Sequence, residues 1–280
     1  MAIIGISGKI GSGKDLVGKI IQYLTSTVNP DPQEFELKYA FTHINVEGSQ
    51  WQIKKFADKL KDIVCLLLGC TRDELEDRVF KESELGKEWE RGVIYTSADM
   101  NTTLIVDSMD EVWKYRTSGK PYFAHAFKPL TPRLLLQLLG TECGRRIIHP
   151  NIWVNALMAD YKGELKQMEG SGPFSRPAMH TEFPNWCITD VRFPNEAKAI
   201  EEKSGLVIRV ERSACERNFT GSKNPLSLMD QIKQDTHESE TALDFFPFGV
   251  TIENDGSIED LVEKVRGINF PKNYFLTLLP

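Results

Sequence analysis

The chain opens on a short apolar segment, a glycine-rich segment and a second apolar pattern with a different period. Ile3, Ile4 and Ile6 form the first segment and predict a β-strand that stops at Gly8. From Lys14 onward, apolar side chains recur at the spacing of one helix face, at Leu16, Val17, Ile20, Ile21 and Leu24. This opening is therefore predicted to be a strand, a glycine-rich turn and a helix.

Similar patterns follow along the rest of the chain. Residues 35–56 are expected to be extended segments around a turn at 47–49. Helices are predicted over 57–69, 71–80, 130–146, 151–165 (capped by Asn151), 194–205 and 258–266. Short strands are predicted over 186–190, 206–212 and 248–252, and loops over 170–184 and 212–237. Residues 81–130 are polar and mixed, and their pattern predicts no element.

Strands that alternate with helices predict an α/β fold with a mainly parallel sheet and helices on both faces. In such a sheet, ligands bind outside the carboxyl ends of the strands. The glycine-rich turn, Asp58 and Asp190 each follow a predicted strand. We therefore expect these three features at the same edge of the sheet.

Composition and charge narrow the class of protein. The 280 residues carry a formal net charge of −6, which argues against a dedicated nucleic-acid binder. Five scattered cysteines without a CxxC pair favour reduced thiols. No apolar run is long enough to span a bilayer, and no secretory signal is visible, so we expect a cytoplasmic protein without membrane partners.

The glycine-rich turn fits the first seven positions of the phosphate-loop pattern GxxxxGK[ST], from Gly8 to Lys14. Glycines allow backbone N–H groups to turn inward toward phosphate oxygens, and Lys14 adds a positive charge. The alternative is a connection that binds no ligand. Asp15 stands where Ser or Thr is usual. Its carboxylate could hold Mg²⁺ directly, hold it through water, or only suit the first helical turn.

A second group of charged residues suits an anionic substrate. Asp190 follows an apolar strand, as a metal-supporting acid does, although it could instead cap the next helix. Arg192 follows two residues later. Arg145 and Arg146 end a helix and could clamp a phosphate or only complement the helix dipole. Arg212 and Arg217 lie in a polar segment that is either a mobile lid or a surface loop.

Five stretches, taken together and in order, resemble the deoxynucleoside monophosphate kinases of tailed bacteriophages: IIGISGKIGSGKD, KKFADKLKD, LLLQLLGTECGRRIIHPNIWVNAL, CITDVRFPNEAKAI and HESETAL. The resemblance implies one nucleoside-monophosphate-kinase domain over residues 1–280. It also implies an inserted acceptor-binding region at approximately 70–150 and a lid at approximately 212–237. A loop that ends in GKD is normal for that family. The further implications are Mg²⁺ with ATP as donor, a deoxynucleoside monophosphate (dNMP) acceptor, a homodimer, and the host cytoplasm if the chain is phage-encoded.

The resemblance also implies roles for single residues. ATP would bind at Gly8, Lys9, Gly11, Ser12, Gly13, Lys14, Asp15, His237 and Glu238. The dNMP would bind at Asp58, Lys61, Arg145, Trp153 and Arg192. The catalytic groups would be Lys14, Asp190, Arg192, Arg212 and Arg217, and the metal would be held by Asp15 and Asp190.

The predicted reaction is ATP + dNMP → ADP + dNDP. The acceptor oxygen is already anionic, so positioning and charge neutralisation are needed rather than a strong base. The alternatives are a phosphate-loop kinase of the dephospho-coenzyme A or phosphomevalonate type, and a protein that binds nucleotide without transferring phosphate.

Overall fold

The computed structural model describes most of the chain, namely residues 2–27, 29–42, 46–86, 89, 93–97, 103–106, 122–125, 130–168, 178–212 and 241–268. The chain divides into two compact units. The first combines residues 1–59 with 151–280, and the second is formed by residues 60–150. The acceptor-binding region expected at approximately 70–150 falls within the second unit.

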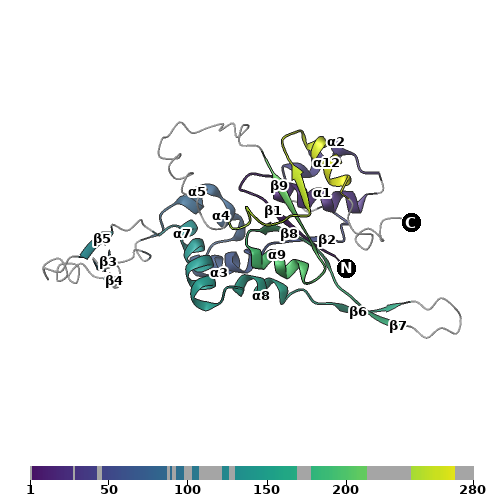
Figure 1. Ribbon diagram of the computed structural model, residues 1–280. Helices are drawn as coiled ribbons and strands as arrows, with labels where there is room; N and C mark the ends of the chain where they lie inside the picture. Colours follow the sequence, from purple (N-terminus) through teal and green to yellow (C-terminus); the bar gives the residue numbers. More distant parts are fainter. Residues whose placement is uncertain are drawn as a thin grey trace. The chain divides into compact units, whose positions relative to one another are not determined.

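The first unit contains a five-stranded sheet in the order β10-β9-β1-β8-β2, with every neighbouring pair parallel (Figure 1). Its strands are β1 (Ile3–Ser7), β2 (Trp51–Lys54), β8 (Asn185–Val191), β9 (Leu206–Glu211) and β10 (Val250–Glu253). Strand β1 lies in the middle, so the glycine-rich turn follows the central strand. The predicted α/β fold with a parallel sheet is confirmed.

Helices cover both faces of this sheet, because alternate side chains of the buried strands point to opposite sides. On one face, Ile4 and Ile6 of β1 share a core with α1 (Lys14–Ser26) and α12 (Ile258–Arg266). On the other face, Ile3 packs with α8 (Ile152–Met158) and α9 (Pro194–Glu201). Figure 1 shows α1 and α12 on one side of the strands and α9 on the other. This double cover explains why β1 reads as an almost continuous apolar run.

Helix α1 approaches strand β8 closely at Gly18. A Cβ atom at Gly18 would lie 2.7 Å from Cγ2 of Thr189, well inside ordinary contact distance. Thr189 is 1 % exposed, so its side chain has little room to move. The absence of a side chain at residue 18 therefore sets the spacing between the helix that follows the glycine-rich turn and the neighbouring strand.

The expectation of extended structure over 35–56 is wrong for its first part. Residues Pro32–Phe35 form the short helix α2, and Glu36–Ala40 continue it as the π-helix η1. Asp31 caps α2 by accepting a hydrogen bond from the Gln33 N–H at 3.0 Å. The rings of Tyr23, Phe35 and Tyr39 pack on one another. This cluster with α1 stabilises helical turns that the local pattern does not indicate.

The region after Asn151 also departs from the prediction. Asn151 occupies the N-cap position of α8 as predicted, but its side chain makes no capping hydrogen bond, and its Oδ1 accepts instead from Asn195 Nδ2 at 2.7 Å. Helix α8 ends at Met158 rather than near residue 165. The antiparallel strands β6 (Glu164–Met168) and β7 (Ala178–Glu182) follow, where the sequence predicts the end of a helix and a loop.

The second unit is mainly helical in its described part. Helix α3 (Asp58–Leu68) begins in the first unit and continues into the second, which also contains α4 (Arg72–Glu76), α5 (Arg78–Glu82), α7 (Pro132–Gln137) and the π-helix η3 (Leu138–Ile148). The single helix predicted over 71–80 is two helices, because Asp77 leaves the helical conformation and caps α5. Within 81–130, three short strands pair antiparallel: β3 (Val93–Ser97), β4 (Thr103–Val106) and β5 (Tyr122–His125).

None of the helices within the described ranges is long and apolar enough to span a membrane.

We expect Gly18→Ala to destabilise the protein by about 1–3 kcal/mol, because the added methyl group must push α1 away from Thr189. Chemical denaturation followed by circular dichroism measures this change. Gly267→Ala is the matched control, because Gly267 has an ordinary φ of −72° and its nearest atoms to a new Cβ lie 3.5 Å away. Equal stabilities for the two variants would contradict the close packing at Gly18.

Candidate active site

The glycine-rich turn between β1 and α1 has the backbone of a phosphate loop. Gly8, Gly11 and Gly13 adopt φ values of 156°, 77° and 97°, which other residues rarely adopt. A Cβ atom at Gly8 would lie 2.4 Å from the carbonyl oxygen of Val210. The first N–H groups of α1 have no partner within the helix, and the helix dipole makes this end attractive to anions. The loop thus has both the shape and the polarity for a phosphate group.

Asn254 anchors the loop from outside. Its Nδ2 donates a hydrogen bond to the Ser12 carbonyl oxygen at 2.8 Å, and the residue is 9 % exposed. In a trans peptide the C=O and N–H groups point in opposite directions, so fixing the Ser12 carbonyl also fixes the Gly13 N–H. A Cβ atom at Gly13 would lie 2.4 Å from this Nδ2 atom. Asn254 directly follows β10, and its place after a strand was a signal that the sequence offered and that the predictions did not include.

Lys14 folds back over the loop. Its Nζ donates to the carbonyl oxygens of Gly8 at 2.6 Å and of Lys9 at 2.7 Å. The ammonium group therefore lies above the turn rather than along α1. This arrangement keeps one positive charge at the loop.

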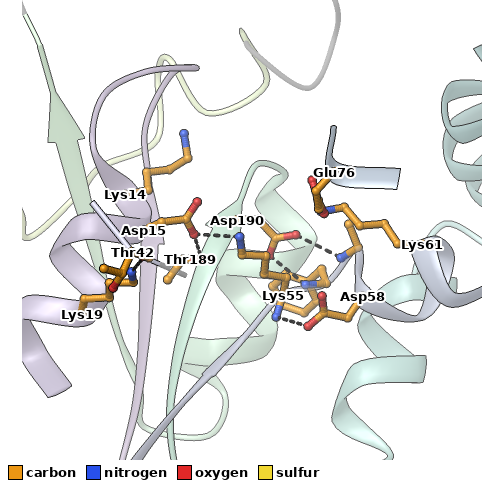
Figure 2. A network of polar contacts seen from close by, with 12 residues as sticks. Lys14, Asp15, Lys19, Thr42, Lys55, Asp58, Lys61, Glu76, Thr189 and Asp190 are labelled. Carbon is orange, nitrogen blue, oxygen red and sulfur yellow. Dashed lines mark hydrogen bonds and ion pairs between the residues drawn. The ribbon is translucent and has the colours of Figure 1, made fainter. Parts of the chain in front are cut away.

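Asp15 is held by two neighbouring segments. Its Oδ1 accepts a hydrogen bond from Thr189 Oγ1 at 2.5 Å and forms an ion pair with Lys55 Nζ at 2.9 Å. Figure 2 shows these contacts converging from α1, β8 and the end of β2. Partial loss of water contact would by itself raise the pKa of Asp15, but the charge of Lys55 and the Thr189 hydrogen bond outweigh this effect and lower the pKa. Asp15 is therefore charged at neutral pH.

Asp190 joins the end of β8 to the turn that follows β2. Its two carboxylate oxygens accept hydrogen bonds from the backbone N–H groups of Phe56 at 2.7 Å and Ala57 at 3.0 Å. Burial raises the pKa of Asp190, against the opposing effect of these hydrogen bonds and of the Arg192 and Lys55 charges. Asp190 thus lies at the predicted strand end, and its visible role is to position the segment before α3.

Three further residues of the first unit were expected to bind the acceptor, namely Asp58, Trp153 and Arg192, and each lies in its own set of contacts. Asp58 Oδ2 accepts a hydrogen bond from the Lys55 N–H at 3.0 Å. Trp153 is 6 % exposed on α8. The backbone N–H of Arg192 donates to Glu196 at 2.7 Å, which stabilises the start of α9.

In the second unit, Lys61 is paired with the carboxylate of Glu76. Glu76 also binds Lys81 at 2.7 Å. Burial alone would raise the pKa of Glu76, but hydrogen bonds from both lysines lower it to about 2. Arg145 lies half-buried on η3, and its neighbour Arg146 forms an ion pair with Glu142 at 2.8 Å.

The expected lid residues lie largely outside the described residues. This applies to Arg217, His237, Glu238 and nearly all of the segment 212–237. Arg212 is described and is exposed directly after β9.

A buried arginine beside the loop was missed by the sequence-based predictions. Arg209 of β9 is 7 % exposed, and its guanidinium lies 3.4 Å from Ser7 Oγ and 3.4 Å from Asp244 Oδ1. It also stacks on the ring of Phe248. Asp244 lies 3.8 Å from Lys9 of the phosphate loop. The signal that could have found Arg209 was a charged residue inside an otherwise apolar strand.

Two comparisons with known proteins bear on this site. The model of the family described as deoxynucleotide monophosphate kinase matches residues 2–265. A deoxynucleoside-5'-monophosphate kinase of Escherichia phage T5 is 27 % identical over 254 residues, with 84 % of this chain and 88 % of that protein covered. The family match includes β1, the phosphate loop and α1, as well as Lys55, which follows β2, and Asp190 in β8. With its phosphate loop at the carboxyl end of the central parallel strand, this chain belongs to the deoxynucleotide monophosphate kinase family.

Proposed function

We propose that the protein transfers the γ-phosphoryl group of ATP to a deoxynucleoside monophosphate, giving ADP and a deoxynucleoside diphosphate. The observation that carries this proposal is the phosphate loop Gly8–Lys14, held open by Asn254, in a chain that belongs to the deoxynucleotide monophosphate kinase family. Family membership does not favour a dephospho-coenzyme A or phosphomevalonate type of acceptor, nor a protein that only binds nucleotide.

The donor is proposed to bind with its phosphate groups on the loop. The glycines turn N–H groups toward one point, and the N-terminus of α1 adds a favourable dipole. Lys14 supplies a point charge to the β- and γ-phosphate oxygens once it leaves the carbonyl oxygens of Gly8 and Lys9. His237 and Glu238 remain proposed ATP-binding residues by resemblance alone.

Mg²⁺ is proposed to accompany ATP, and the side chains at the loop fit such an ion. In proteins Mg²⁺ is commonly held by one or two carboxylates together with substrate phosphates and water, so it requires few protein ligands. No cluster of three metal-binding side chains occurs within the described part of the chain. Asp15 is charged, and its side chain is 64 % exposed, so it suits a direct contact. Asp190 has both oxygens engaged by backbone N–H groups and suits an indirect role. When bound, the ion would neutralise phosphate charge.

Phosphoryl transfer from ATP to a dNMP requires the enzyme to position two anionic substrates, and it does not require a strong general base. The acceptor phosphate oxygen is already nucleophilic, so the enzyme must hold it in line and neutralise the repulsion between the two substrates. A rate enhancement of about 10⁶-fold corresponds to about 8 kcal/mol of transition-state stabilisation. We assign this stabilisation to Lys14 and to the arginines Arg192, Arg212 and Arg217.

The acceptor is proposed to be bound by Asp58, Lys61, Arg145, Trp153 and Arg192. Lys61 and Arg145 are cations suited to a phosphate group. Trp153 is buried and is included by resemblance alone. We also propose a homodimer in the host cytoplasm, without nucleic-acid or membrane partners.

A steady-state screen of all common NMPs and dNMPs with Mg-ATP tests the proposed reaction. We expect at least one dNMP to stimulate ADP release in a coupled assay. Dephospho-coenzyme A and phosphomevalonate serve as competing acceptors. Failure of every dNMP to stimulate ADP release would reject the proposal.

Lys14→Ala should lower kcat by about 100-fold or more, because it removes a charge that stabilises the transferring group. The KM for dNMP should change little. Lys38→Ala is the control, since Lys38 is an exposed lysine paired with Glu34 at 2.6 Å and should retain wild-type kcat. Steady-state kinetics on both variants measures the difference, and a fully active Lys14→Ala protein would contradict the assigned role.

Arg145→Ala should raise the KM for dNMP about tenfold, the loss expected from one charge-assisted hydrogen bond, with a smaller effect on the KM for ATP. Arg146→Ala removes the same charge one residue away, from a side chain that pairs with Glu142. We expect its KM values to stay near those of the wild type. A larger increase in the KM for ATP than for dNMP in Arg145→Ala would exclude the acceptor role.

A further inference from the structure

Asp15 presents an electrostatic problem for a phosphate loop. It follows Lys14 in the first turn of α1, where the usual Ser or Thr carries no charge. A carboxylate at this point repels the phosphates of ATP, and repulsion between close charges is strong wherever water is partly excluded. To bind ATP without a metal ion, a loop that carries Asp here therefore needs a compensating positive charge from another side chain.

Lys55 supplies such a charge at contact distance. Its Nζ lies 2.9 Å from Asp15 Oδ1, and its side chain is 29 % exposed. Thr189 donates to the same oxygen atom at 2.5 Å. The two donors come from the end of β2 and from β8, so they reach Asp15 from elements outside the loop (Figure 2).

The backbone around Lys55 is fixed as well. Three consecutive N–H groups donate to carboxylates: Lys55 to Asp58 at 3.0 Å, Phe56 to Asp190 at 2.7 Å and Ala57 to Asp190 at 3.0 Å. A side chain on such a segment starts from a defined position, so less conformational freedom is lost when it pairs with Asp15. Its neighbour Lys54 points elsewhere, with its Nζ over the ring of Trp186 at 5.4 Å.

We propose that Lys55 is a positioning residue that neutralises Asp15, and that this ion pair allows the phosphate loop to accept ATP with an aspartate in place of Ser or Thr. Lys55 acts through Asp15 rather than on the phosphates. The pair has no net charge, so it leaves the attraction of Lys14 and of the helix N-terminus undiminished. The inference rests on one part of the proposed function, namely that the loop binds ATP.

A double-mutant cycle on ATP binding tests the proposal. Kd values are measured by isothermal titration calorimetry on the full chain with ATP alone, in EDTA and without dNMP. We expect Lys55→Ala to raise the Kd about tenfold or more, a loss of one unit on the logarithmic scale of affinity. Asp15→Asn should bind metal-free ATP at least as tightly as the wild type. Lys55→Ala combined with Asp15→Asn should fall within about threefold of Asp15→Asn alone, since coupled residues are not additive.

The deciding quantity is the effect of removing Lys55 in each background. A large effect in the wild-type background and a small one in the Asp15→Asn background supports the proposal. An equally large effect in both backgrounds would show that Lys55 contacts the phosphates itself, and no effect in the wild-type background would also overturn the proposal. Lys54→Ala is the matched control, because it removes the same charge from the adjacent position, and we expect its Kd to stay at the wild-type value.

The test also needs a control for variants that do not fold. Thermal unfolding verifies that each variant is folded. If Lys55→Ala shows no cooperative unfolding transition, Lys55→Gln replaces it, because glutamine keeps most of the aliphatic chain. Because binding is measured without an acceptor, the result does not depend on phosphoryl transfer. A chain that shows the expected coupling but phosphorylates no dNMP would reject the proposed function and retain the role of Lys55.

Discussion

A phosphate loop binds anions only while several backbone N–H groups face one point, and glycine-rich backbone does not hold that shape unaided. In this protein the shape is imposed from outside. Asn254 holds the Ser12 carbonyl, the Val210 backbone leaves no room for a side chain at Gly8, and β1 holds the start of the loop in the middle of the sheet. The parallel sheet is therefore the part of the fold on which the site depends.

Charge balance is the second requirement at the same edge of the sheet. The described residues there include carboxylates at Asp15, Asp58 and Asp190, although the expected ligands are themselves anionic. Each carboxylate is satisfied within the protein, by Lys55 and Thr189 or by backbone N–H groups. Negative charges thereby serve to fix the geometry of the site.

Much of the fold could be predicted because the relevant signals are local. In β1, α1, β8 and α12, the spacing of apolar residues is visible in consecutive positions of the sequence. The apolar faces that this spacing predicts are buried. The turns of η1 could not be predicted, since they depend on the packing of Phe35 and Tyr39 against Tyr23. Asn151 does stand at the N-cap of α8, but its side chain binds Asn195, which lies 44 residues away. In the candidate site, the loop and Asp190 stood out because each follows a strand and belongs to a short pattern. Lys55 and Thr189 did not, because their partners lie far away in sequence: Thr189 is 174 residues from Asp15. Asn254 also follows a strand, but its partner Ser12 lies 242 residues away.

The link between Asn254 and Ser12 has a consequence for synthesis of the chain. The loop leaves the ribosome long before its anchor, which is made 242 residues later, after β10. Until that strand has joined the sheet, the loop lacks the support that fixes the Gly13 N–H. The backbone of the loop therefore depends on a strand that is synthesised near the other end of the chain.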